Sequence, residues 1–202
     1  MKNTSARNVR KPRLAGRVSP DQRVRKTRGA AHDALISLAR ETPYDSIAVQ
    51  DILNRADIAR STFYTHFGNK NDVLESGIVE MLRLAHHQRR KEAGVERVVG
   101  FSLPFLEHIA GHRQGGGAHM PHGSRVVFHE RLQTILADSI AQDLKATRRA
   151  ATPSIPADLL GRHIASTFVL VLNWWLECEP SMTPAQVDAR FRRLVLPLLA
   201  DV

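Results

Sequence analysis

The spacing of apolar residues in the first half of the chain predicts four helices with very short connections. Between residues 23 and 40 the apolar side chains recur at steps of three and four, the period of an amphipathic helix. Two short helices are expected at residues 49–56 and 60–67, and a longer one at residues 71–90. The breaks between them are Thr42-Pro43-Tyr44, Asp57 and Gly68-Asn69-Lys70. No alternating pattern of the kind that predicts a strand occurs in this part of the chain.

The second half also has a helical period. Helices are predicted at residues 95–112, with a kink at Pro104, and at 124–149, 157–177 and 184–200. A glycine- and histidine-rich stretch, residues 111–123, predicts a loop. The pattern therefore predicts an all-α protein with a disordered arm at residues 1–20, a small helical domain at 21–68 and a larger helical domain at 69–202.

The second and third helices, joined by a tight turn, have the layout of a helix-turn-helix. The third helix carries a run of hydrogen-bond donors, while Phe63 and Phe67, four residues apart, are expected to anchor its opposite face in the core. The donors are Arg60, Ser61, Thr62, Tyr64, Thr65 and His66. These features favour a DNA-binding domain of three helices followed by a larger helical domain.

The charge distribution fits a polyanionic partner. The formal net charge is +9, and residues 1–28 hold ten Lys or Arg against the single acid Asp21. Such an arm gains free energy beside phosphates by releasing counterions, but a disordered, solubilising tail would have the same composition. Cys178 is the only cysteine, which excludes an intrachain disulfide and favours a reducing, cytoplasmic location. No secretory signal is recognisable, and the apolar run at residues 164–176 is too short to cross a bilayer, so no membrane partner is expected.

Residues 51–74 resemble the DNA-binding signature of the TetR family of bacterial transcriptional regulators. They read DILNRADIARSTFYTHFGNKNDVL, in which T-F-Y-x-H-F-x-x-K follows D-I at the family's spacing. Three positions depart from the signature. Leu53 replaces a small alanine, Asp57 replaces the turn glycine, and Ala48 stands where a capping, phosphate-binding threonine is usual.

The resemblance implies roles for individual residues. The side chains expected to face base edges are Gln50, Arg60 and Ser61, because Arg can donate two hydrogen bonds to guanine and Gln can pair with adenine. The side chains expected on phosphates are Arg25, Arg28, Thr62, Tyr64, Thr65, His66 and Lys70. For Tyr64 and His66 the alternative is a structural role within the domain, and for Arg60 it is a solvated surface charge. The alternative for Lys70 is that it stabilises a helix terminus or pairs with an acidic neighbour.

The two C-terminal helices each have a broad apolar face, and the family resemblance implies that together they form half of a four-helix dimer interface. The residues expected there are Leu160, Ile164, Val171, Trp175, Phe191, Leu194, Val195 and Leu198. The resemblance also implies that the larger domain is a helical ligand-binding and dimerisation domain, with a ligand pocket among the helices predicted at residues 95–200. An ordinary core position is the alternative for each candidate wall of this pocket. Those candidates are Phe101, Phe105, Phe128, Leu132, Phe168 and Trp174.

Other chemistry has little support in the sequence. His108 and His112 have the i, i+4 spacing of metal ligands, but no carboxylate or cysteine is near, so neither a metal nor another cofactor is expected. No phosphate-binding glycine loop, nucleophile elbow or paired-cysteine motif occurs, so the sequence does not predict an enzyme.

Two hypotheses follow from the sequence. The first is a homodimeric repressor that binds double-stranded operator DNA and is released by an unknown small-molecule effector. The alternative is a DNA-binding adaptor or activator whose C-terminal domain binds a protein partner instead of a small ligand.

Overall fold

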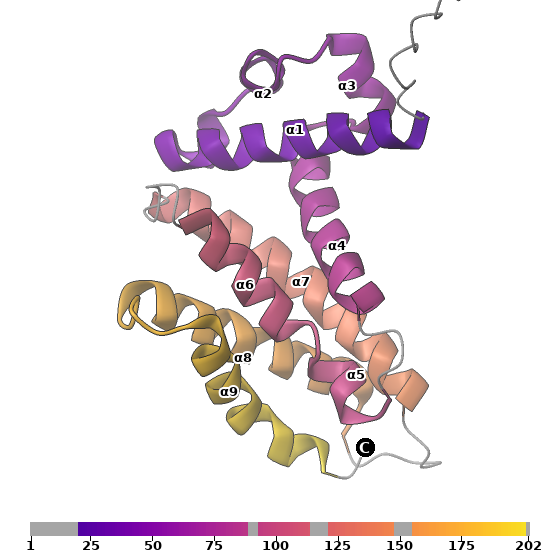
Figure 1. Ribbon diagram of the computed structural model, residues 1–202, viewed down its shortest axis with the longest axis vertical. Helices are drawn as coiled ribbons and strands as arrows, with labels where there is room; N and C mark the ends of the chain where they lie inside the picture. The colour runs from indigo at the N-terminus through magenta and orange to yellow at the C-terminus, as the bar shows by residue number, and fades with distance from the viewer. Residues whose placement is uncertain (1–19, 89–92, 114–120, 148–154, 201–202) are drawn as a thin grey trace, which may run out of the picture.

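A computed structural model describes residues 20–88, 93–113, 121–147 and 155–200, and throughout these ranges the only regular elements are helices. A small N-terminal bundle lies at one end of the molecule, and α4 leads from it into a larger helical body (Figure 1). This arrangement confirms the predicted all-α fold. The basic arm predicted at residues 1–20 lies outside the described residues except for Pro20.

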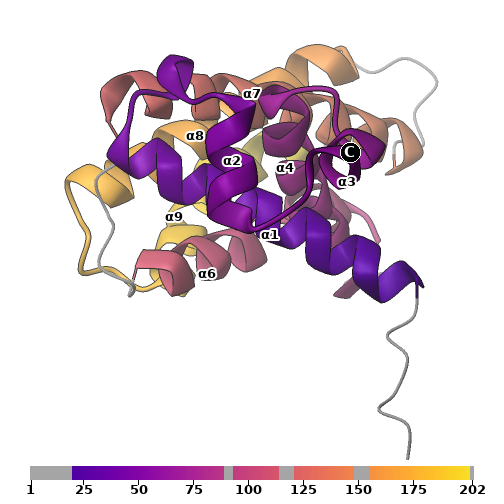
Figure 2. The ribbon, with the colours of Figure 1, turned by 90° about the horizontal axis from the view of Figure 1, so that it is seen from above.

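The N-terminal bundle consists of α1 (Pro20–Glu41), a 3-10 turn η1 (Tyr44–Ser46), α2 (Val49–Ala56) and α3 (Arg60–His66). Seen from above, α2 and α3 lie on the outer side of α1 (Figure 2). Ile52 and Phe63, both fully buried, close the core of this bundle. The predicted helices and breaks agree with these elements to within a few residues.

Helix α4 (Lys70–Gln88) joins the bundle to the body and packs against α1 on one side and α7 on the other. Its contact with α1 is close at Gly77, where a Cβ atom would lie 1.9 Å from the His32 ring. Its contact with α7 includes an ion pair of 3.1 Å between Glu75 and Arg131. Helix α4 is thus held by side chains from both parts of the molecule.

The body contains α5 (Val95–Val99), α6 (Ser102–Arg113), α7 (His122–Thr147), α8 (Ala157–Glu177), α9 (Pro184–Val195) and the 3-10 turn η2 (Leu196–Leu199). The prediction of a single helix at residues 95–112, kinked at Pro104, is wrong. Two helices occupy this range, and the break between them lies at Gly100 and Phe101. Pro104 falls in the first turn of α6, where a missing N–H costs nothing. The last helix ends earlier than predicted, at Val195, because Pro197 cannot continue its hydrogen bonds.

Helices α7 and α8 form the closest pair in the body. Gly161 of α8 lies against α7, and a Cβ atom added there would be 2.7 Å from the carbonyl oxygen of Ala137 and 3.1 Å from the amide nitrogen of Ala141. By length and composition alone α8 is apolar enough to cross a membrane, but half of its apolar stretch is buried within the protein. The buried half of this stretch belongs to the core of the body.

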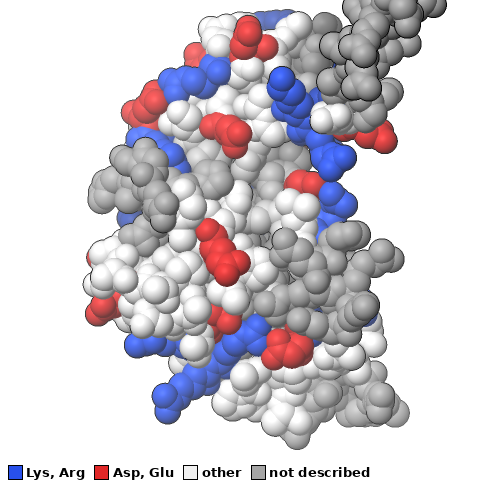
Figure 3. Space-filling view, viewed as in Figure 1, with Lys and Arg blue, Asp and Glu red and all other residues white. Residues whose placement is uncertain are grey.

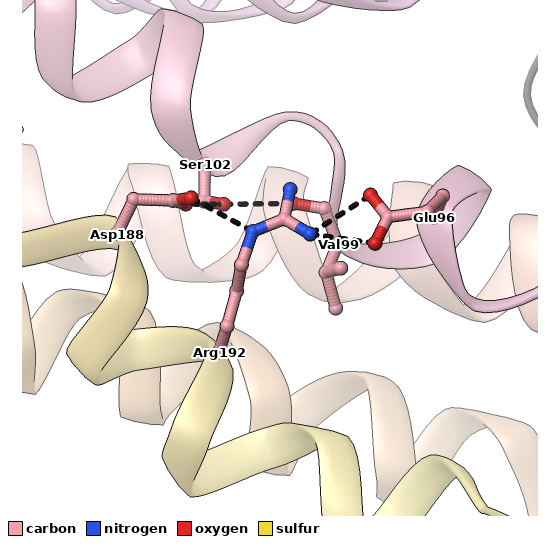
Figure 4. Close-up of polar contacts among 5 residues, drawn as sticks. All are labelled: Glu96, Val99, Ser102, Asp188 and Arg192. Carbon is pink, nitrogen blue, oxygen red and sulfur yellow. Dashed lines mark hydrogen bonds and ion pairs between the residues drawn. The ribbon is translucent and has the colours of Figure 1, made fainter. Parts of the chain in front are cut away.

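A polar network fastens α9 to the start of the body (Figure 4). The Ser102 hydroxyl, fully buried, is hydrogen-bonded to the Asp188 carboxylate. Arg192 Nε donates to the other Asp188 oxygen at 2.7 Å, and Arg192 Nη1 reaches both carboxylate oxygens of Glu96 at 2.8 Å. Burial opposes the charge of Arg192, but its bonds to Glu96 and Asp188 outweigh it, so its pKa is raised.

Candidate nucleic-acid interface

The turn between α2 and α3 is built from a residue in the left-handed region. Asp57 has φ 51° and ψ 51°, and the amide of Ile58 donates to the Leu53 carbonyl oxygen at 3.2 Å. Asp adopts this conformation more readily than most residues, which explains how it replaces the signature's glycine. At the start of α2, Asp51 accepts a bond of 2.8 Å from the amide of Ala48. The amide of Asp51, which a threonine hydroxyl at position 48 would accept from, donates instead to the Ala48 carbonyl oxygen at 3.1 Å.

Helix α3 is anchored by one face and open on the other. Phe63 and Phe67 are buried, with ring centroids 5.3 Å apart, and the Arg28 guanidinium lies 5.8 Å from the Phe67 ring. Tyr64 is half exposed, its ring edge-on to Phe63 at 5.4 Å. The other predicted contact residues of α3 range from half-buried to exposed: Arg60, Ser61 and Thr65 are exposed, and Thr62 and His66 are half-buried.

Three side chains form a hydrogen-bonded chain across the outer surface from α3 to α2. Arg60 Nη2 donates to Gln50 Oε1 at 2.7 Å, and Gln50 Nε2 donates to Asn54 Oδ1 at 2.9 Å. Two predicted base-facing residues are thus brought into direct contact. Asn54 was not predicted, although its position four residues after Gln50 on the same helix face is a signal that the sequence contains.

Lys70 lies differently from the sequence expectation of a phosphate contact. Its ammonium donates to the carbonyl oxygens of Tyr44, Asp45 and Ile47, at 2.7, 3.1 and 2.9 Å. An ammonium has three hydrogens, so these bonds use all of its donors. Tyr44 beside it is buried, which raises the pKa of its phenol to about 12, and its hydroxyl donates to Asn71. In this arrangement Lys70 holds η1 against the start of α4.

The arginines of the bundle differ in how far their charge is compensated. Arg55 is paired with Glu41 through two bonds of 2.9 and 2.7 Å, which lowers the Glu41 pKa. Arg25 and Arg28 are near enough to Glu80 of α4 to help lower its pKa, although the hydrogen bond from Arg83 is the main cause. Lys and Arg side chains gather at the upper right of the molecule, on the side where α1 begins (Figure 3).

The residues expected at a dimer interface divide into two groups. Leu160, Ile164, Val171, Trp175, Phe191 and Val195 are buried in the core of the single chain. Side chains that are at most a few per cent exposed cannot contact a partner subunit. These six predicted interface residues are therefore core residues of the single chain. Leu194 and Leu198 are exposed. Leu159 and Leu170 of α8 are also exposed, although they were not among the predicted interface residues.

The residues expected to line a ligand pocket also fall into two groups, buried and half-buried. Phe101, Phe105, Leu132 and Phe168 are buried. Phe168 packs edge-on against Phe101, Phe105 and Phe191, with ring centroids 5.0, 5.4 and 5.3 Å apart, and Phe101 also lies edge-on to Phe191 at 6.0 Å. Phe128 and Trp174 are half-buried. The two candidate metal ligands, His108 and His112, both lie on α6, where His108 is exposed. The described part of the chain has no group of three or more metal-ligating side chains.

The fold and this surface define a class: a helix-turn-helix bundle joined through α4 to a helical body. Residues 32–76 match the family model of bacterial regulatory proteins, tetR family. The uncharacterized HTH-type transcriptional regulator YxbF of Bacillus subtilis is 39% identical over 59 residues, which are 29% of this chain and 16% of that relative. The match thus spans only a small part of the relative's length.

Solved structures share the fold over most of the chain. A TetR transcriptional regulator from Streptococcus agalactiae is 25% identical with a TM-score of 0.50, covering 87% of this chain and 96% of that one. The fatty acid degradation regulator FadR from Bacillus halodurans is 16% identical with a TM-score of 0.56, covering 83% and 97%. Residues 32–76 therefore match the DNA-binding region of the tetR family, and the chain as a whole is similar in fold to a TetR transcriptional regulator.

Proposed function

We propose that this chain is a cytoplasmic, homodimeric repressor that binds operator DNA with α3 and releases it when a small molecule binds the helical body. The observation that carries the proposal is the exposed Arg60, held by a neutral partner on the outer face of the helix-turn-helix. Its neighbours Ser61, Tyr64 and Thr65 are exposed on the same short helix. A row of donors on one exposed helix is what major-groove recognition requires.

The proposed DNA surface combines base-reading and phosphate-binding groups. Arg60 and Ser61 would face base edges, while Arg25, Arg28, Thr62, Tyr64, Thr65 and His66 would lie along the backbone. Phosphate contacts hold the protein in register without reading sequence, and each one steepens the salt dependence of binding. We leave Lys70 out of this set because its three donors are engaged by carbonyl oxygens.

The proposed dimer forms through the outer face of α8 and α9. Leu159 and Leu170 are 57% and 66% exposed, and Leu194 and Leu198 are 56% and 40% exposed. Leu159 and Leu170 are eleven residues apart, about three helical turns, and therefore lie on one face. Two such faces brought together by a two-fold axis would cover this apolar surface and present two reading helices to a palindromic site.

Sedimentation analysis tests the dimer. Leu170→Glu should convert the protein to a monomer, because it places a charge in the proposed contact. Val79→Glu, at an apolar residue of α4 that is also half exposed, is the matched control and should remain dimeric. A wild-type protein that is monomeric would contradict the dimer and favour the adaptor hypothesis, in which these leucines bind another protein.

The proposed effector site lies between α7 and α8, where Asn173 and His129 meet. Asn173 Nδ2 lies 3.3 Å from His129 Nδ1, and Asn173 Oδ1 is buried without a hydrogen-bond partner among the described residues. Burial, assisted by Arg125, lowers the pKa of His129 and so favours the neutral form of its ring. Phe128 and Trp174, which precede His129 and follow Asn173 in the chain, are half-buried. A few polar groups among apolar side chains are typical of small-molecule sites.

Fluorescence anisotropy with labelled DNA flanking the chain's own gene tests operator binding, in a salt titration. Arg60→Ala should lose about 5- to 150-fold in affinity for the specific site and little for random DNA, since a good bidentate base contact contributes about 1–3 kcal/mol. Arg25→Ala should weaken binding to both and reduce the salt slope by about 1. Lys145→Ala, an exposed charge in the last turn of α7, is the control and should change neither.

Effector release is tested separately, by screening small molecules for loss of anisotropy at constant salt. Asn173→Leu should leave operator binding intact and abolish release, because only the effector site is altered. If wild-type protein binds its flanking DNA no more tightly than random DNA, the repressor proposal is wrong for that locus. If Asn173→Leu is released as readily as wild type, the effector site lies elsewhere.

A further inference from the structure

The chain of hydrogen bonds from Arg60 to Asn54 has a fixed direction. A guanidinium can only donate, so Gln50 must present its amide oxygen to Arg60. The amide nitrogen of Gln50 then points to Asn54, whose oxygen accepts its hydrogen bond. The orientation of both amides is therefore set by the charge of Arg60.

This direction changes the role expected of Gln50. Reading adenine requires a glutamine to offer its amide oxygen and nitrogen together to one base. In this protein the oxygen accepts from Arg60 and the nitrogen donates to Asn54. Each polar atom of the Gln50 amide therefore already has one partner, and these two bonds orient the amide along the line from Arg60 to Asn54.

Arg60 keeps the donors that a base contact needs. A guanidinium has five N–H groups, and Nη2 uses one of its two hydrogens on Gln50. A pair of parallel N–H groups remains for a second acceptor. In the major groove the base edge with two adjacent acceptors is that of guanine, at O6 and N7.

The positive charge of Arg60 is also available to interact with DNA. Arg55, on the neighbouring helix, is neutralised by two bonds to Glu41. Within the described residues, the bond found for Arg60 is to an uncharged amide. A neutral partner orients the guanidinium and reduces the side-chain entropy that binding must remove, yet leaves its positive charge for the nucleic acid.

We infer that Arg60 reads a guanine in each operator half-site and that Gln50, itself held by Asn54, is a positioning residue for Arg60 and does not read a base. The inference rests on the proposed function. It assigns the identity of one base in an operator whose sequence is unknown. It also assigns to Asn54, which is bonded to Gln50, a part in positioning Arg60.

Selection from a pool of random double-stranded oligonucleotides tests the inference, using the full-length chain and four variants. Wild type should enrich a two-fold symmetric site with guanine at one position of each half. Arg60→Ala should lose the preference at that position alone, with affinity for the selected site reduced about 5- to 150-fold. Gln50→Ala and Asn54→Ala should keep the guanine and bind about 2- to 10-fold more weakly, the effect of one hydrogen bond.

The double variant Arg60→Ala/Gln50→Ala separates positioning from reading. If Gln50 acts through Arg60, its removal should change affinity less than 2-fold once Arg60 is absent, and no second base position should lose its preference. The inference is overturned if the Arg60-dependent position is not guanine, or if Gln50→Ala removes a preference for adenine at another position. All three residues are exposed, and circular dichroism of each variant should match wild type.

The same selection experiment distinguishes a failure of the proposed function from a failure of the inference about Arg60 and Gln50. If wild-type protein enriches no site, the proposed function fails and the inference fails with it. If wild type enriches a symmetric site whose bases do not depend on Arg60 as described, the proposed function stands and only the inference is wrong.

Discussion

Gly161→Ala should destabilise the helical body even though alanine is the better helix former. Gly161 lies within α8, and a Cβ atom there would approach the carbonyl oxygen of Ala137 to 2.7 Å and the Cβ of Ala141 to 3.2 Å. The oxygen belongs to the backbone of α7, so it cannot rotate away as a flexible side chain would. The two helices must separate, and α7 and α8 form the largest contact between elements in the chain.

The size of the effect follows from two opposing terms. Replacing Gly by Ala in a helix favours folding by about 1 kcal/mol. Forcing a methyl group into a well-packed contact costs about 1–3 kcal/mol, and a contact this short with backbone places the cost near the upper end. The net expectation is a loss of roughly 2 kcal/mol in the free energy of unfolding, or about 4–8 °C in melting temperature for a chain of this length.

Urea denaturation followed by circular dichroism measures this change, with all variants at one protein concentration because association would add to stability. Gly111→Ala is the matched control. It lies in α6 of the same body, and a Cβ atom there meets nothing within 4 Å. The control should be unchanged or more stable by up to about 1 kcal/mol. If Gly161→Ala raises the urea midpoint as Gly111→Ala does, the close approach of α7 and α8 is incorrect.

Three further predictions concern the turn, the joint between the bundle and the body, and a buried histidine. Asp57→Gly should be more stable than Asp57→Ala by about 1 kcal/mol, because residue 57 has φ 51° and glycine adopts this left-handed conformation at a lower cost than alanine. Equal thermal stability of the two variants would contradict the left-handed turn. Gly77→Ala should cost about 1–3 kcal/mol because its Cβ would overlap the His32 ring, and adding His32→Ala should recover most of that loss; a strictly additive double variant would show that the two residues do not touch. The pKa of His129 is lowered in the folded protein from 6.5, first by burial and then by Arg125, so the unfolded chain binds the proton more tightly. Its contribution to stability is full above the unfolded pKa and decreases as pH falls below it, so unfolding free energy should decrease between about pH 8 and about pH 5.5. His129→Gln should reduce this decrease, and a decrease of the same size in that variant would assign it to other groups.

The sequence by itself determined the helices of the bundle and the register of the helix-turn-helix. Helix period, breaks at Pro and Gly, and the T-F-Y-x-H-F-x-x-K spacing are local properties, so they can be recognised without knowing what a helix packs against. Val49–Ala56 and Ala157–Glu177 were predicted to the residue for this reason. Pro104 was misinterpreted because proline is acceptable in a first helical turn, and the pattern alone did not show that a new helix began at Ser102.

Only the tertiary structure decided which chemical groups remain available. Lys70 has the family's position for a phosphate contact, yet three carbonyl oxygens from η1 and its flanks take its donors. Gln50 and Arg60 both suit base recognition, yet a bond of 2.7 Å between them makes one the support of the other. The apolar faces of α8 and α9 likewise needed the positions of α6 and α7 before Phe191 could be assigned to the core and Leu194 to the surface. Sequence patterns state the type of a side chain and its face on a helix, but its partners come from segments far away in the chain, and these partners decide whether it is free to bind.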